Sequence, residues 1–318
     1  METNSSNLAP LNPAVNDGAH IHMNNSDEDD RGQPGGENSM EPVPLHGSVL
    51  ENVQFGMRLG NDVTERVWNL KYAIREEGLT PPSAFELVQI VLCGENREDN
   101  LEKVRWFHHF RAAHDIEESV ESGLSCVKDA MKLFPGFFLS FHVVTMEGRE
   151  EFTLAMDASM LNARRFFEEN GRKLLLRALY FCLNALNPNF LAIENGPLIL
   201  VECESFNWMN FTVGAHRQLQ TELFSHYPTR VNQARHYNTG LFANMLWSMG
   251  RPFFPKKQRN KFQMGCKTGV GNLNEFFLKP TVEIANQRFL EALAVALEQR
   301  YYFASVFELP SDTRQQNH

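Results

Sequence analysis

Residues 196–205 read GPLILVECES, and this stretch indicates the fold. Leu, Ile, Leu and Val occupy positions 198–201 without a polar interruption. A strand with one solvated face alternates apolar and polar residues, whereas a continuous apolar run is typical of a strand buried on both faces. The stretch therefore predicts a strand in the interior of a covered sheet.

Helical patterns flank this strand. Residues 171–186, GRKLLLRALYFCLNAL, form a long pattern that stops at Asn187 and Pro188, and residues 214–228, GAHRQLQTELFSHYP, form the next one. Strands that alternate with helices build parallel sheets with helical cover. We therefore expect an α/β fold with a mostly parallel sheet under helical cover.

Other segments complete this sheet. Residues 137–146, FFLSFHVVTM, and 151–157, EFTLAMD, enclose the turn EGRE and predict a hairpin. Residues 233–238, QARHYN, and 261–266, KFQMGC, are weaker strand candidates. Residues 283–303 have the pattern of a closing amphipathic helix.

The amino-terminal part has a different composition. Residues 1–48 are rich in Asn, Gly, Pro and acid, and they predict a disordered acidic tail. Residues 61–131 carry apolar residues at helical spacing, which predicts a small all-helical lobe. We expect the α/β domain over residues 132–280 and the closing helix over residues 281–309.

The charge distribution is uneven. The chain of 318 residues has a formal net charge of -9, yet residues 223–274 contain no Asp or Glu. The cations of this stretch are Arg230, Arg235, Arg251, Lys256, Lys257, Arg259, Lys261 and Lys267. Near an anionic membrane each cation contributes about 1 kcal/mol, so the four from Lys256 to Lys261 supply roughly 4 kcal/mol at most. That energy suits reversible docking.

The segment before these cations, LFANMLWSM at residues 241–249, is apolar nearly all round. Phe242, Met245, Leu246 and Met249 share one face, and Leu241, Trp247 and Phe253 crowd the other. Such a helix is either buried on every side or meets something apolar outside the protein. Composition alone does not choose between these readings.

Targeting and redox signals are few. The chain begins without a basic region followed by an apolar one, and no apolar run reaches the roughly 18 to 20 residues of a spanning helix. Its five cysteines are far apart and form no C-x-x-C pair. Such cysteine usage favours a reducing compartment over a disulfide framework or a zinc site. We expect a cytoplasmic protein.

The sequence lacks complete motifs for a phosphate loop, a metal site or nucleic-acid binding. GCKTGVGN at residues 265–272 lacks the Gly that a phosphate loop needs directly before Lys267, where Cys266 stands. His108, His109 and His114 lack metal-ligand spacing on a helix. The basic stretch has no interleaved aromatic residues for base stacking, which disfavours nucleic acid. We expect no metal and no cofactor.

Glu202 and Glu204 form the one candidate catalytic pair, because alternate residues of a strand point to one face. The other reading is structural, with carboxylates at a strand end that pair with a helix. An enzyme that uses these residues is therefore an open alternative, and a non-enzymatic protein is the favoured prediction.

The ordered set of segments resembles the CRAL-TRIO family of lipid-binding domains, which includes tocopherol-transfer, retinaldehyde-binding and yeast phosphatidylinositol-transfer type proteins. GPLILVECES is similar to the family's central strand, and HYPTRVNQARHYN to its Tyr-Pro helix end and following strand. LFANMLWSMGRPFFPKKQRNKFQMG is similar to its gating helix, Lys-Pro-Phe turn and last strand. The resemblance covers roughly residues 80–275.

The resemblance implies a lipid cavity that the sheet floors and a gating helix closes. The residues it assigns to cavity and gate are Leu198, Leu200, Leu241, Phe242, Met245, Leu246, Met249 and Phe253. Those it assigns to the headgroup or the membrane surface are Thr229, Arg230, Arg251, Lys256, Lys257, Arg259 and Lys261. The implied function is non-enzymatic binding and transfer of a hydrophobic ligand or phospholipid by a protein peripheral to membranes.

Two positions depart from the phosphatidylinositol-transfer members, where an acid follows Tyr-Pro and a Lys precedes Pro-Phe. Thr229 and Arg251 stand there in this chain. Arg251 keeps a charge that can bind a phosphate, while Thr229 has no carboxylate, so another phospholipid or a small apolar ligand fits equally well. The alternative function is a scaffold of the same fold that binds a protein partner through this surface.

Overall fold

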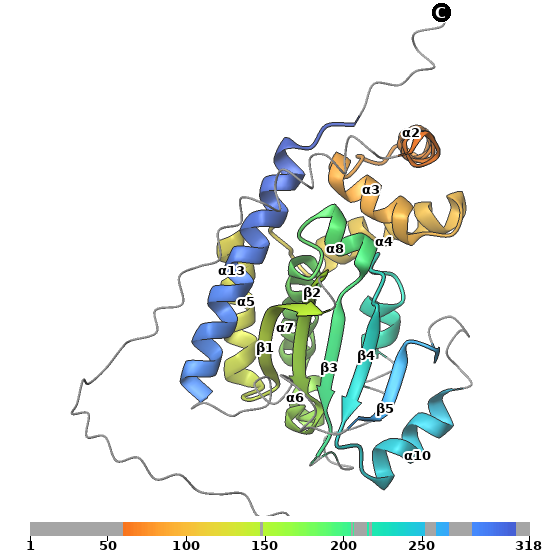
Figure 1. Cartoon of the computed structure of the whole chain (residues 1–318). Coiled ribbons are helices and arrows are strands. Elements are labelled where there is room, and N and C mark those ends of the chain that lie inside the picture. Colours follow the sequence, from red (N-terminus) through yellow and green to blue (C-terminus); the bar gives the residue numbers. More distant parts are fainter. Residues whose placement is uncertain are drawn as a thin grey trace, which may run out of the picture. The chain divides into compact units, whose positions relative to one another are not determined.

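The computed structural model describes residues 60–146, 149–204, 206, 215, 218–251, 259–266 and 282–309. Its centre is a five-stranded sheet in which the strands follow one another in chain order (Figure 1). The strands are β1 (Phe138–Met146), β2 (Arg149–Asp157), β3 (Leu198–Glu202), β4 (Gln233–Tyr237) and β5 (Phe262–Cys266).

The pairing confirms the predicted mostly parallel sheet. β1 and β2 form an antiparallel hairpin, whereas β2, β3, β4 and β5 pair in parallel. The predicted central strand is β3, and Leu198, Ile199 and Leu200 are all buried in it. Both faces of this strand are covered, as its continuous apolar run predicts.

Helices cover one face of the sheet. Ile199, Leu154 and Ala234 point to that face and belong to one large apolar core with residues of three helices. These helices are α5 (Val120–Leu133), α7 (Glu169–Ala185) and α13 (Val282–Val306). The ring of Phe289 on α13 lies 5.6 Å from that of Phe138 on β1, so α13 packs at the β1 edge.

Close packing of these helices depends on Gly123 of α5. A Cβ atom at this position would lie 2.8 Å from Leu297 Cδ1 of α13 and 3.0 Å from Phe181 Cδ1 of α7. Only glycine lets the three helices approach this closely.

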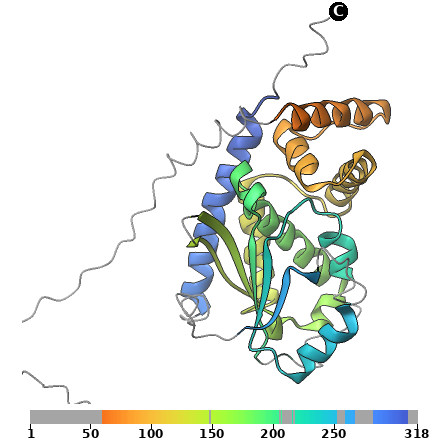
Figure 2. The same cartoon turned by 45° about the vertical axis from the view of Figure 1, so that its right-hand side comes forward.

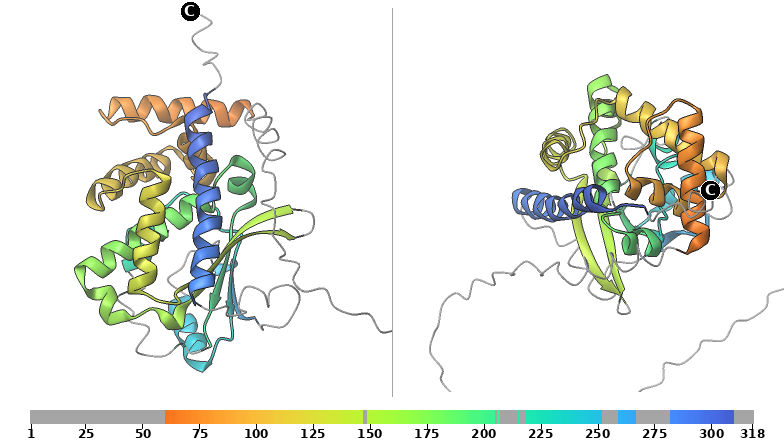
Figure 3. Two further views of the ribbon diagram at one scale, coloured as in Figure 1. Left: turned by 90° about the vertical axis from the view of Figure 1, so that its left-hand side faces the viewer. Right: turned by 90° about the horizontal axis from the view of Figure 1, so that it is seen from above.

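The predicted helical lobe precedes the sheet. It consists of α2 (Asn61–Glu76), α3 (Ala84–Cys93) and α4 (Arg97–Ala113). Gly78, at φ 71°, ends the first helix region, and Ser83 and Glu86 form a capping box at the start of α3. The next helix, α5, packs against α7 and α13 rather than within this group (Figure 3).

The remaining described elements are short. They are η1 (Ala158–Met160), α6 (Ala163–Phe167), α8 (Phe190–Asn195), the π-helical η2 (Gln220–Phe224) and α10 (Leu241–Gly250). Of the helix predicted at residues 214–228, residues 215 and 218–224 are described as helical, and η2 is the π-helical part of them. The predicted tail at residues 1–48, and Phe253, Lys256 and Lys257, lie outside the described residues. Within those residues, no helix combines the length and apolarity that a bilayer crossing requires.

Candidate functional site

The helix α10 follows the carboxyl end of β4 and lies beside β5, at the sheet edge opposite to the one that α13 covers (Figure 2). Leu241, Met245 and Met249 are four residues apart and therefore share one side of α10. Their side chains are 93%, 44% and 65% exposed. One side of α10 is thus an uncovered apolar stripe.

The opposite side of α10 packs against the protein. Trp247 stacks on Phe262 of β5 at a centroid distance of 5.0 Å, and Phe242 lies 5.8 Å from Phe206. Ala243 is buried and Leu246 is half-buried. The helix is therefore neither a fully buried core helix nor a free one, because one side is packed and the other is exposed.

Leu198 and Leu200 lie on the sheet face opposite to α5, α7 and α13. They form a small buried cluster with Ala155 of β2 and Tyr237 of β4. Among the described residues, this cluster contains no residue of α10. In the described part of the chain, the expected cavity residues of β3 therefore lie in a buried cluster that does not include those of α10.

The described cations of the acid-free stretch occupy different places. Arg251 is exposed directly after α10, and Arg230 is exposed before β4. Lys261 Nζ donates a hydrogen bond of 2.7 Å to the Val231 carbonyl, and Arg259 is half-buried before β5. These four described cations therefore differ in exposure and do not all lie in one solvated loop.

Arg230 and Lys261 come close to the helical lobe. Burial raises the pKa of the Cys93 thiol on α3 to about 12, while the charges of Arg230, Lys103 and Lys261 act to lower it. A charge influences a buried thiol in this way only from nearby. Lys103 belongs to the lobe and is paired with Asp99, whereas Arg230 and Lys261 bring positive charge to this side of the lobe from the acid-free stretch.

Thr229 lies in a segment that is anchored to the helices. Its hydroxyl contacts the Asn187 side chain, with Asn187 Nδ2 donating to Thr229 Oγ1 at 3.3 Å. Tyr227 Oη donates to Asn184 Oδ1 at 2.6 Å, and Gln89 Nε2 donates to the Pro228 carbonyl at 2.8 Å. Residues 227–229 are thus held by α7 and α3, and they contribute no negative charge.

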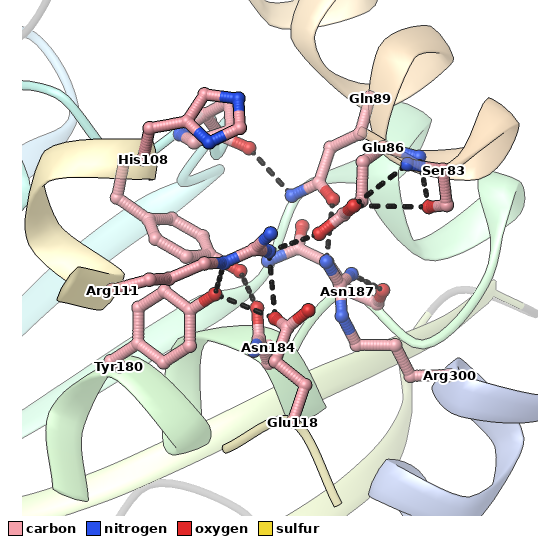
Figure 4. Close-up of polar contacts among 12 residues, drawn as sticks. Ser83, Glu86, Gln89, His108, Arg111, Glu118, Tyr180, Asn184, Asn187 and Arg300 are labelled. Carbon is pink, nitrogen blue, oxygen red and sulfur yellow. Dashed lines mark hydrogen bonds and ion pairs between the residues drawn. The ribbon is translucent and has the colours of Figure 1, made fainter. Parts of the chain in front are cut away.

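A buried polar network continues from this segment (Figure 4). Arg111 of α4 pairs with Glu86 of α3 and with Glu118, and its Nε donates to Tyr180 Oη at 2.9 Å. From α13, Arg300 donates to the Asn187 carbonyl at 2.9 Å. The network therefore joins the helical lobe to α7 and α13.

The pKa values of the two carboxyl groups of the network, Glu86 and Glu118, are shifted in opposite directions. Burial acts to raise the pKa of Glu86, but the charges of Arg111 and Arg300 outweigh burial and lower it. Burial and the charge of Glu86 raise the pKa of Glu118, which Arg111 only partly offsets. The network thus holds one strongly ionised carboxylate beside a carboxyl group that gives up its proton less readily.

The sequence reasoning missed this network. The signal for one member is present in the sequence, because Leu293, Ala296, Leu297 and Phe303 surround Arg300 on the buried side of α13. An arginine at helical spacing within an apolar stripe indicates a buried partner. The partner itself, on α3 and α7, is not indicated by any local pattern.

Glu202, the candidate catalytic residue, occupies the end of β3. Its Oε1 accepts the backbone N–H groups of Cys203 and Glu204, each at 2.8 Å, and Asn238 Nδ2 donates to both carboxylate oxygens. These contacts fix the turn after β3 and the backbone before α10. The carboxylate therefore holds the loop at the end of β3 in place. The structural interpretation of the sequence expected it to pair with a helix instead.

Comparison with protein families matches residues 146–283 to the CRAL/TRIO domain. No curated protein matches the chain. The matched region contains β2, β3, β4, β5 and α10, and it leaves out α2 to α5 and nearly all of α13. The family consists mainly of non-catalytic proteins that bind lipophilic ligands, although some members are associated with enzymes. Residues 146–283 of the chain thus match the CRAL/TRIO domain.

Proposed function

We propose that this protein binds a hydrophobic ligand or phospholipid without catalysis and carries it between membranes. The ligand lies in a cavity that Leu198 and Leu200 help to line and that α10 closes. The protein docks reversibly on an anionic membrane surface through the exposed side of α10 and the neighbouring cations. It works in the cytoplasm, peripheral to membranes.

The exposed stripe of Leu241, Met245 and Met249 carries this proposal. A large apolar side chain gains about 1.5–3 kcal/mol when it leaves water, so three such side chains gain several kcal/mol in a bilayer interface. Arg251 follows the stripe directly and adds about 1 kcal/mol near anionic lipid. These energies give binding that is useful and still reversible.

The segment that precedes α10 would allow this helix to move as a gate. The helix starts after Gly240, and nothing lies within 4 Å of the position that a Cβ atom would occupy there. Asn238, just before it, adopts a φ of 50°. A pivot at residues 238–240 lets α10 leave β5 at the cost of the Trp247–Phe262 stack, and it exposes the apolar interior only on a membrane.

The headgroup side of the proposal rests on Arg230, Arg251 and Lys261, whose charges suit a phosphate. Lys256, Lys257 and Arg259 extend the membrane contact. Thr229 offers a hydroxyl in place of a carboxylate, and it already contacts Asn187. We therefore propose a phosphate-bearing lipid as ligand, with inositol lipids as one member of that class.

A second candidate is a scaffold that binds a protein partner through the same surface and takes up no lipid. The burial of Leu198 and Leu200 favours it, because these side chains pack against Ala155 and Tyr237 of the protein itself. An enzyme acting through Glu202 is a weaker candidate, since the carboxylate oxygens already accept hydrogen bonds from the surrounding loop.

Liposome flotation tests the docking surface. We expect the wild-type protein to float with vesicles that contain phosphatidylserine, and we expect Met249→Asp to lose most of that binding. Met160→Asp is the matched control, because Met160 is also an exposed methionine but lies outside α10. Equal flotation of all three proteins would contradict docking through α10.

Mass spectrometry of the bound lipid tests the cavity. The purified protein is incubated with a total eukaryotic lipid extract, re-isolated and extracted with organic solvent. One lipid class in near-stoichiometric amount supports the carrier function. An empty extract from folded protein that still floats would favour the scaffold.

A further inference from the structure

The helix α13 has an uncovered outer side. Ile284, Val295 and Tyr302 are exposed on it. They are separated by eleven and seven residues, which correspond to three and two helical turns, so they form one line along the helix. Figure 3 (left) shows α13 in front of the other described elements along its whole length. Arg288, Glu291 and Glu298 are exposed between them, so the outer side of α13 carries three exposed apolar side chains among charged ones.

A groove of about 560 Å³ runs between α5 and α13. Its apolar floor is formed by Leu124 and Met131 of α5 and by Leu290 and Ala294 of α13. This groove lies next to the outer side of α13 and at the β1 edge of the sheet. It is therefore distinct from the surface around α10, which lies beside β5.

The two walls of the groove carry opposite charges. Lys128 and Lys132 line it from α5, and Glu283 and Glu291 line it from α13. Among the described residues no ion pair joins the walls, because Lys132 pairs with Asp129 of its own helix and Glu291 accepts from Gln287 of its own helix. An apolar floor thus lies between a basic and an acidic wall whose charges do not pair with each other.

We propose that this groove, together with the outer side of α13, is the contact surface of a homodimer. A two-fold axis that runs along the groove places α5 of one copy over α13 of the other. Each pair of lysines then faces a pair of glutamates, and the apolar floor of the groove leaves water. A second copy is the fitting partner because the surface carries its own charge complement.

The dimer leaves the α10 surface free, since the two surfaces lie at opposite edges of the sheet. Self-association and lipid binding are therefore separable, and each can fail without the other. The test of the dimer is made on the full chain without lipid.

Sedimentation velocity across a concentration series measures the self-association. We expect the wild-type protein to pass from monomer to dimer as its concentration rises, with a dissociation constant that increases with salt. Lys128→Glu with Lys132→Glu makes both walls acidic, and Glu283→Lys with Glu291→Lys makes both walls basic. Each double variant is expected to weaken dimerisation on the order of tenfold or more.

A mixture of the two double variants gives the most specific test of the charge pairing in the proposed dimer. An acidic-walled copy attracts a basic-walled copy, so the mixture is expected to form heterodimers although neither variant forms dimers alone. Arg75→Glu with Arg97→Glu is the control for general charge effects, because both residues are exposed on the helical lobe. Circular dichroism verifies that every variant is folded.

A wild-type protein that stays monomeric at all attainable concentrations would overturn the proposal. Dimerisation that both groove variants retain at wild-type strength, or a failure of the mixed variants to associate, would overturn it equally.

Discussion

Arg300 of α13 and Gln89 of α3 are 211 residues apart in the chain, and Arg300 Nη2 donates a hydrogen bond of 3.0 Å to Gln89 Oε1. The same guanidinium donates through Nη1 to the Asn187 carbonyl at the end of α7. One buried side chain of α13 thus bridges the helical lobe and the end of α7, both of which precede it in the sequence.

Replacement of Arg300 by Met tests the strength of this bridge. The variant leaves the Asn187 carbonyl and Gln89 Oε1 without their donor and removes a positive charge near Glu86. Loss of one partner from a buried charged group costs about 3–5 kcal/mol. Urea unfolding should show a loss of this order, whereas Arg288→Met, at an exposed position of α13, should change stability by less than about 0.5 kcal/mol. A similar small loss for both variants would refute the bridging role.

His114 predicts a pH dependence of stability. Burial lowers the pKa of this imidazole from 6.5 to about 4, and the nearby Lys173, Arg172 and Arg177 act in the same direction. The folded state therefore prefers the neutral ring, while the unfolded chain takes up a proton as the pH falls below 6.5. Stability contributed at neutral pH is consequently lost progressively between pH 6.5 and 4.

Urea unfolding at a series of pH values measures this loss. His114→Gln removes the titrating group, so its stability should fall less steeply than that of the wild-type protein between pH 6.5 and 4. Parallel curves for the two proteins would show that His114 does not carry the dependence.

Gly123 predicts a local limit on side-chain size. Gly123→Ala brings a methyl group to 2.8 Å from Leu297 Cδ1, so α5 or α13 must move. Overpacking of this kind costs about 1–3 kcal/mol, although alanine is the better helix former. Gly240→Ala, with no atom within 4 Å of its added methyl group, serves as the control and should have little effect. Thermal unfolding of the two variants distinguishes them, and an unchanged Gly123→Ala protein would mean that the helices can separate without loss.

Thr229 predicts the ligand preference within the proposed function. Thr229→Glu combined with Arg251→Lys restores the acid and the lysine that phosphatidylinositol-transfer members have at these positions. A carboxylate there accepts hydrogen bonds from inositol hydroxyls, so we expect the share of inositol lipid in the organic extract to rise relative to the wild-type protein. The single Arg251→Lys variant is the control, and an identical lipid profile in all three proteins would contradict a role of position 229 in selectivity.

The elements with a strong local pattern could be predicted from the sequence. The continuous apolar run of β3 and the hairpin pattern of β1 and β2 each depend on nearby residues, and the pairing confirms both predictions. The sequence pattern assigns most of α5 to the helical lobe at residues 61–131, whereas in the structure this helix packs against α7 and α13. Its place depends on the approach of Leu297 to Gly123, which no local window of sequence contains.

The candidate site was predictable only in part. The apolar composition of residues 241–249 indicates a helix but cannot show which side is covered, because that depends on the contact of Trp247 with Phe262. Residues such as Glu86 and Arg300 look like ordinary charged residues of amphipathic helices. Their burial follows from partners that the chain brings together only across the whole fold.

The position of Arg300 also sets an order of assembly on the ribosome. The lobe, the sheet and α10 all precede Arg300 in the chain, so each is synthesised before the side chain that joins them is available. Before Arg300 is synthesised, Arg111 is present near Glu86 but Arg300 is not. Gln89 Oε1 then lacks the hydrogen bond that Arg300 donates to it. The contacts of Arg300 with Gln89 and with the Asn187 carbonyl can therefore form only after α13 has been synthesised, and a chain interrupted before residue 300 leaves both buried acceptors without this donor.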